Sequence, residues 1–150
     1  ETKIAGRYIT AIYGIFDTEE LKFTYTSAGH DPPILRFRSA DRSIIALPNR
    51  GRILGVFPTL ENDLHTVVLE PGDRLLFLTD GIVEEINDAG EMFGLSRVSA
   101  ILTAVEFEGL ENIFTGVASF TGNRKETGDD MAAVLVEVME LQTAPRTSDA

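Results

Sequence analysis

RLLFLTDGIVE, at residues 74–84, leads a run of apolar residues directly into an acidic residue followed by glycine. The apolar run before Thr79 is typical of a strand whose two faces are both buried. Asp80 then stands at the end of that strand, and Gly81, which has no side chain, lets backbone or water approach closely. This stretch therefore predicts a carboxylate presented at the end of a buried strand.

A second stretch near the C-terminus combines the same features in the opposite order. Asp129 and Asp130 follow Gly128 and come just before an apolar run at residues 131–138. If the two strand ends converge, their carboxylates supply the oxygen ligands that Mg²⁺ and Mn²⁺ prefer. Spacing alone leaves open the alternative that both stretches are simple turns, because turns favour the same Asp and Gly residues.

Upstream of residue 80, the sequence predicts three β-hairpins. Segments rich in Ile, Val, Phe, Tyr and Thr alternate with short polar stretches, which is the usual pattern of antiparallel strands joined by turns. The third turn, at residues 70–73, has the Pro-Gly centre that favours a tight turn. The expected strand pairs are residues 8–15 with 21–27, 34–38 with 44–47, and 65–69 with 74–79.

The spacing of apolar residues then changes to that of helices. Apolar residues recur at steps of three and four over residues 95–105 and again over residues 110–117, so each segment predicts an amphipathic helix. The apolar run at residues 131–138 predicts a last strand that is covered on both faces. Strands followed by two helices and a final strand indicate a layered α+β domain.

Composition limits the classes of function. The chain has 150 residues, of which 43% are hydrophobic, and this fits one compact domain. It has no cysteine, so a metal must be bound through oxygen or histidine. The net charge of −11 disfavours binding to nucleic acids and anionic lipids, and it favours divalent cations as partners. Because no apolar run approaches the roughly 18 residues of a membrane helix and no leader is visible, we expect a soluble, cytoplasmic protein.

Residues 26–34, 69–73, 76–84, 90–94 and 128–131 form a series of short motifs. They resemble, in the same order, segments of the SpoIIE/RsbU-type family of PP2C-like serine/threonine phosphatases, among them NAGHPP, L-x-PGD, TDG-x-x-E and DD-x-T. The matches cover nearly the whole chain. The resemblance implies the PP2C-like αββα fold, an antiparallel β-sandwich layered with helices.

The resemblance also implies metal-dependent hydrolysis. In this family two divalent ions, Mn²⁺ or Mg²⁺, hold a bridging water that attacks the phosphorus of a phosphoserine or phosphothreonine. Asp80 matches the aspartate that ligates this binuclear centre and Asp129 matches a further ligand, so these two are expected to carry catalysis. Gly81 and Asp130 belong to the same expected metal site, Asp130 either as a ligand or by orienting a water. Glu84 matches an acid associated with a further, weaker metal; the alternative is that it simply faces solvent.

The sequence also departs from the family pattern. It lacks the GGD and D-x-S-GHG motifs, which supply further metal ligands. We therefore expect residues 1–141 to form only the later part of the domain, without its N-terminal strands and helices, and residues 142–150 to be a disordered tail. An open sheet edge should result, covered by a second copy of the chain or by an upstream segment. Ala132 or Ala133 stands where the DD-x-T motif has Thr, which removes one hydroxyl near the site.

Two classes of function follow. As an enzyme, the protein would dephosphorylate a regulatory signalling protein, and the family suggests a phosphorylated anti-sigma-factor antagonist. As a non-catalytic pseudophosphatase, it would bind a partner without turnover. Because an incomplete set of carboxylates binds metal weakly, the isolated chain is expected to have little activity. His30, in the NAGHPP-like segment, is expected to order its loop rather than to transfer a proton.

Overall fold

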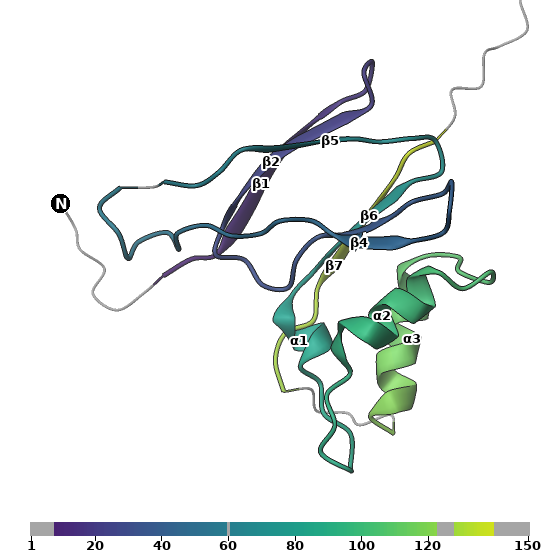
Figure 1. Ribbon diagram of the computed structural model, residues 1–150. Coiled ribbons are helices and arrows are strands. Elements are labelled where there is room, and N and C mark those ends of the chain that lie inside the picture. Colours follow the sequence, from purple (N-terminus) through teal and green to yellow (C-terminus); the bar gives the residue numbers. More distant parts are fainter. Residues whose placement is uncertain (1–7, 60, 123–127, 140–150) are drawn as a thin grey trace, which may run out of the picture.

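The computed structural model describes residues 8–59, 61–122 and 128–139 (Figure 1). In chain order its elements are β1 (Ala11–Asp17), β2 (Lys22–Ala28), β3 (Leu35–Phe37), β4 (Ile44–Ala46), β5 (His65–Val68), β6 (Arg74–Leu78), α1 (Asp80–Val83), α2 (Gly94–Leu102), α3 (Leu110–Phe120) and β7 (Ala133–Glu137). Strands, then helices, then a final strand is the order expected from the sequence, with the single turn α1 as an addition.

The strands form two antiparallel sheets. The first has the order β1-β2-β5 and the second has the order β4-β3-β6-β7. The first two predicted hairpins are confirmed, because β1 pairs with β2 and β3 pairs with β4, in both cases antiparallel. Antiparallel sheets combined with a few helices confirm the expected α+β class.

The third predicted hairpin is wrong, because its two strands join different sheets. β5 pairs with β2, whereas β6 pairs with β3 and β7. The turn itself is present, and the Asp73 amide donates to the Glu70 carbonyl at 2.9 Å. Asp73 is only 1% exposed, and its carboxylate accepts hydrogen bonds from the Arg36 guanidinium in β3 and from the Ser39 amide just after it. These bonds attach the start of β6 to β3, so the turn carries the chain from one sheet to the other.

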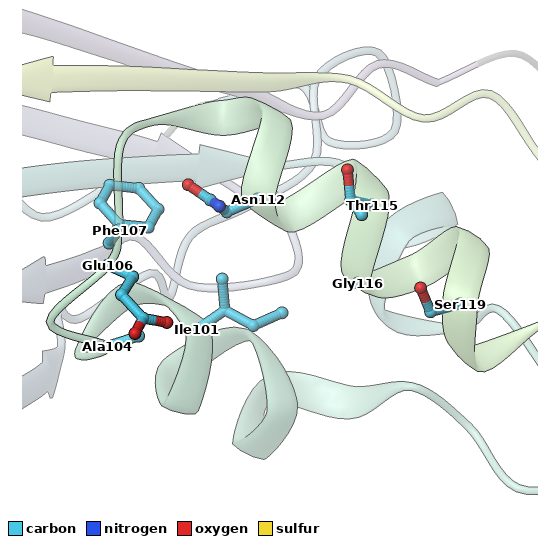
Figure 2. A pocket seen from close by; sticks show the side chains of 8 residues that line it. All are labelled: Ile101, Ala104, Glu106, Phe107, Asn112, Thr115, Gly116 and Ser119. Carbon is cyan, nitrogen blue, oxygen red and sulfur yellow. The ribbon is translucent and has the colours of Figure 1, made fainter.

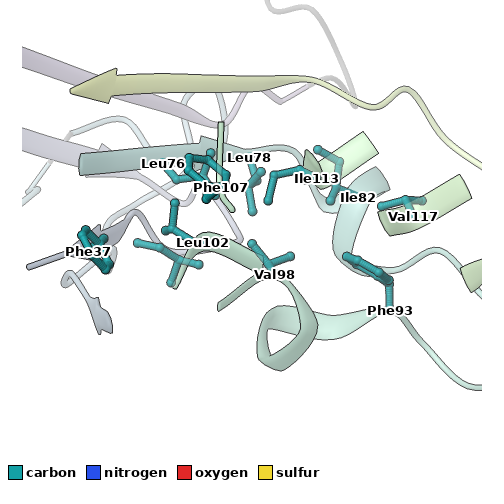
Figure 3. Close-up of a cluster of buried hydrophobic side chains, with 11 residues drawn as sticks. Phe37, Leu76, Leu78, Ile82, Phe93, Val98, Leu102, Phe107, Ile113 and Val117 are labelled. Carbon is teal, nitrogen blue, oxygen red and sulfur yellow. The ribbon is translucent and has the colours of Figure 1, made fainter. Parts of the chain in front are cut away.

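Two apolar clusters form the core between the layers of the molecule. One joins the two sheets and contains Phe23 and Tyr25 from β2 and Leu75 from β6. Because Leu76 and Leu78 belong to the other cluster, both faces of β6 are buried, as predicted. The helices lie on the side of the second sheet that faces away from the first (Figure 1). The cluster between helices and sheet, drawn in Figure 3, includes Leu76, Leu78, Ile82, Val98, Leu102, Ile113 and Val117.

The two predicted helices are confirmed, with one corrected end. α2 buries Val98 and Leu102, and α3 likewise buries one apolar face against the sheet. α2 ends at Leu102 instead of the predicted residue 105, and Val105 is 91% exposed. The helical spacing of apolar residues in the sequence therefore continues beyond the residue at which the helix itself ends.

β7 and β1 lie at sheet edges within the part of the chain that the structure describes. Val134 of β7 is 57% exposed, so the prediction that both faces of this strand are covered is wrong. The strand lies at the edge of the sheet, beside β6 alone, and fewer neighbouring side chains cover it. In β1, Tyr13 and Ile15 are 69% and 60% exposed. Among the described residues the first sheet thus has an edge strand with exposed apolar side chains, in agreement with the open edge expected from the sequence.

The expected tail at residues 142–150 lies outside the described residues, as do residues 1–7. Its disorder and the domain boundary at residue 141 therefore stay predictions. Within residues 8–59, 61–122 and 128–139, no helix is long and apolar enough to cross a membrane.

Candidate functional site

Asp80 lies where the sequence places it, directly beyond the buried strand β6. The strand ends at Leu78, and after Thr79 the chain turns into α1, whose first residue is Asp80. The Asp80 side chain is exposed, and its Oδ1 accepts a hydrogen bond from the Gly81 amide at 3.0 Å. The carboxylate is therefore held near the start of α1 while remaining open to solvent.

The segment before β7 is bonded to the end of β6. β6 and β7 pair in antiparallel register up to Leu78 opposite Ala133. Beyond this pair, the Thr79 amide donates to the Ala132 carbonyl at 3.0 Å. The Thr79 hydroxyl accepts from the Ala132 amide at 2.9 Å and donates to the Asp130 carbonyl at 3.0 Å. Thr79 thus extends the β6–β7 pairing and draws the segment that carries Asp130 alongside Asp80.

Gly81 marks the closest approach of the two segments. A Cβ atom placed on Gly81 would lie 2.6 Å from the Asp130 carbonyl oxygen and 3.3 Å from the Asp129 carbonyl carbon. Such a distance is too short for any side chain, so glycine is required where the backbones pack together. The structure therefore brings together the two segments that the sequence predicts to converge (Figure 1 shows the start of β7 beside α1).

Carboxylates at this junction suit a hard divalent cation. Asp80, Asp129, Asp130 and Glu84 are all exposed, and Asp129 Oδ1 accepts from the Asp130 amide at 2.7 Å. Mg²⁺ is commonly held by one or two carboxylates and keeps several waters. Among the described side chains, however, no group of three or more His, Asp or Glu residues lies close enough together to hold a metal ion. The residues present fit the carboxylate part of a metal site and leave the remaining ligand positions to water or to other groups.

Two residues at this junction escape the sequence analysis, Thr79 and Glu85. Glu85 is only 9% exposed, and its Oε1 accepts a hydrogen bond from the Gly128 amide at 2.8 Å. The sequence analysis selects Glu84, whose side chain is exposed. The adjacent pair of glutamates was the available signal, but both follow the single turn α1, so no periodicity shows which of them points inward.

His30 connects the loop after β2 to the end of β6. Its Nε2 lies 2.9 Å from the Leu78 carbonyl oxygen. Because a carbonyl only accepts hydrogen bonds, the Nε2 atom is the donor. The Asn49 side chain donates in turn to the His30 carbonyl at 3.0 Å. These two bonds support the expectation that His30 orders its loop.

A groove between α2 and α3 is separate from this junction (Figure 2). It has a volume of about 280 Å³ and contains none of the residues predicted to bind metal. One carboxylate alone lines it, so it does not offer the paired acids that the proposed chemistry needs. The lining residues are Ile101, Ala104, Glu106, Phe107, Asn112, Thr115, Gly116 and Ser119.

Comparison with known proteins decides the family. The family model for stage II sporulation protein E (SpoIIE) matches residues 1–139. The chain belongs to the SpoIIE family. This membership agrees with the resemblance from which Asp80 and Asp129 are expected to be metal ligands.

Individual relatives of this SpoIIE-family chain match parts of longer proteins. It is 30% identical over 80 residues to the phosphoserine phosphatase RsbU of Bacillus subtilis, covering 53% of the chain and 24% of RsbU. It is 26% identical over 97 residues to protein IcfG of Synechocystis, covering 65% of the chain and 15% of IcfG. The SiaA-PP2C domain of Pseudomonas aeruginosa shares the fold with a TM-score of 0.69 at 18% identity, over 87% of the chain and 52% of that domain. The expected PP2C-like architecture is thus confirmed, and the chain spans a quarter or less of these two sequence relatives.

Proposed function

We propose that this chain is part of a metal-dependent protein serine/threonine phosphatase. The observation that carries the proposal is the packing of the Asp80–Gly81 backbone against the Asp129–Asp130 backbone, with all three carboxylates exposed. A relative that is 30% identical over 80 residues, RsbU, is a phosphoserine phosphatase. Acids that are exposed to solvent suit a substrate that is itself a folded protein or a flexible phosphorylated segment.

Divalent ions are the cofactors that these residues suit. Solved structures with this fold include a Bacillus subtilis SpoIIE phosphatase domain presoaked with Mn (TM-score 0.63) and RsbX in complex with magnesium (TM-score 0.58). In this chain Asp80 and Asp129 would be the ligands, with Asp130 and Glu84 beside them. A bound pair of such ions lowers the pKa of a water and offsets negative charge on the phosphoryl oxygens. The chain itself orients the two aspartates through Gly81 and the Thr79 hydroxyl.

The proposed substrate is a phosphorylated regulatory protein, and family membership suggests an anti-sigma-factor antagonist. The net charge of −11 makes a nucleic-acid substrate unfavourable, because phosphates would be repelled. A cytoplasmic location stays a prediction from the sequence.

We also propose that a second copy covers the open face of the β1-β2-β5 sheet when the chain is alone. Light scattering checks this, and a clean monomer would contradict it.

A non-catalytic binding module is the second candidate function. The specific observation in its favour is that the described residues contain no cluster of three metal-ligating side chains. A site with two carboxylates binds a cation more weakly than a complete one. Such a module would bind the phosphoprotein without hydrolysing it.

The experiment that tests the proposal is Mn²⁺-dependent hydrolysis of a phosphoserine peptide by the full-length protein. Asp80→Asn should lower the rate at least about a hundredfold, because a metal ligand contributes more than the outer-shell partners whose loss costs 10–100-fold. Asp63→Asn, at an exposed acid in the loop before β5, is the matched control and should leave the rate unchanged. A rate that is unaffected by Asp80→Asn would remove the mechanism. Binding of the phosphopeptide without turnover would favour the binding module.

A further inference from the structure

We propose that Glu85 is a positioning residue, which fixes the segment carrying Asp129 against the segment carrying Asp80. The proposal rests on the function proposed above. It differs from the metal-ligand roles inferred from the family motifs, because Glu85 would act through a backbone amide and would not touch the metal.

The first argument is the burial of the residue Glu85. Its residue is 9% exposed, and a carboxylate loses much of its hydration free energy at such a position unless hydrogen bonds replace the water. The bond from the Gly128 amide to Oε1, at 2.8 Å, is such a replacement. Hydrogen bonds to a charged acceptor are stronger than those between neutral groups. Glu85 therefore binds Gly128, the residue directly before Asp129, through this hydrogen bond.

The second argument is that Glu85 stands on a fixed base. Its carbonyl accepts a hydrogen bond from the Phe93 amide at 2.8 Å. Phe93 is 2% exposed, and Ile82, three residues before Glu85, is fully buried in the cluster between helices and sheet. A side chain that extends from a fixed backbone can hold the segment to which it is hydrogen-bonded.

The third argument is the placement of the contacts along the segment. Thr79 holds the downstream part through the Asp130 carbonyl and the Ala132 amide. Gly81 packs against the middle. Glu85 holds the upstream end at Gly128, so Asp129 lies between two attachment points. Removing the upstream attachment should let Asp129 move while the β6–β7 pairing persists.

The test compares two substitutions of similar shape in the full-length protein. Glu85→Gln keeps an oxygen acceptor for the Gly128 amide, and Glu85→Met fills the same space without an acceptor. Glu108→Ala, at an exposed acid in the connection between α2 and α3, is the control for a change of net charge. Glu85→Ala serves as a second acceptor-free variant should the Met variant not fold. The readouts are Mn²⁺ affinity from titration of free Mn²⁺, the metal-free hydrogen exchange of the Gly128 amide, and the melting temperature.

We expect Glu85→Met to weaken Mn²⁺ binding about tenfold, the lower end of the effect seen when a partner of a metal ligand is lost. The Gly128 amide should exchange faster without metal, and Glu85→Gln and Glu108→Ala should stay close to the parent. Parent-like Mn²⁺ affinity of an acceptor-free variant would overturn the positioning role and leave the proposed function standing. Equal weakening by Gln and Met would also overturn it, because charge and not the hydrogen bond would then matter. A parent protein that binds no Mn²⁺ would overturn both.

Discussion

Asp73 is an acid whose role is structural, unlike the exposed carboxylates of the candidate site. Its Oδ2 lies 2.5 Å from Arg36 Nη2, and its Oδ1 accepts from the Ser39 amide at 2.9 Å. Burial by itself raises the pKa of this carboxyl, but the hydrogen bonds from Ser39, Arg36 and Glu70 outweigh burial and hold the pKa below the usual 3.8. A lowered pKa means that ionised Asp73 stabilises the fold above about pH 4, and that this contribution is lost as pH falls through the folded-state value.

Asp73→Asn should therefore destabilise the protein in a pH-dependent way. At pH 7 we expect a loss of about 3 kcal/mol in the free energy of unfolding, because the partly buried Arg36 loses its ionic partner. The difference from the parent should shrink as pH falls below about 4, because the unfolded parent chain takes up the proton before the folded one does. Urea unfolding at pH 3 and pH 7 measures this, with Asp63→Asn as the exposed control. A loss that is the same at pH 3 and pH 7 would contradict the assignment.

At the scale of elements, Gly81 determines how closely α1 approaches the segment before β7. Gly81→Ala places a Cβ 2.6 Å from the Asp130 carbonyl oxygen, and this backbone atom cannot move aside as a flexible side chain would. We expect a loss of about 1–3 kcal/mol in stability, as for other overpacked sites, together with weaker Mn²⁺ binding.

The matched control for this prediction is Gly116→Ala in α3. There the new Cβ would lie 2.5 Å from Ile101 Cδ1, the far end of a flexible side chain. Alanine also favours the helix by about 1 kcal/mol relative to glycine. Chemical denaturation and Mn²⁺ titration of both variants make the comparison. If Gly81→Ala had the stability and Mn²⁺ affinity of the parent, the close packing of the two segments would be in doubt.

Local sequence signals predicted most elements, and long-range contacts decided the rest. The first two hairpins and both amphipathic helices follow from patterns within short continuous stretches of chain, the longest of which is residues 11–28. The third hairpin was mispredicted because the turn at residues 70–73 fixes a change of direction but not a partner strand. The partner is chosen by Arg36, more than thirty residues upstream, which binds the buried Asp73.

The same limit applies to the candidate site. Two acid–glycine pairs at strand ends predicted that the segments around Asp80 and Asp129 would meet, because each pair adjoins an apolar strand. The residues that attach one segment to the other, Thr79 and Glu85, were not predicted. Thr79 acts through backbone atoms about fifty residues further along the chain, and Glu85 lies just beyond α1, where no helical spacing indicates its direction.

At the scale of the whole molecule, β6 links the core to the candidate site. It contributes fully buried residues to both apolar clusters, and its C-terminal end leads directly to Asp80. The helices cover one side of the second sheet, and the first sheet covers the other (Figure 1). Asp80 thus extends from a strand that is buried on both faces, which restricts the motion of the backbone that carries it.

Paramagnetic broadening by Mn²⁺ in NMR spectra of the ¹⁵N-labelled protein tests directly whether Asp80 and Asp129 share one cation site. We predict that the amide signals of Gly81 and Asp130 broaden together at the same low Mn²⁺ concentration, while Gly72, before the opposite end of β6, stays sharp. Asp80→Asn should abolish the broadening at both positions. Broadening of one segment alone, or broadening of Asp130 that survives Asp80→Asn, would contradict a shared site.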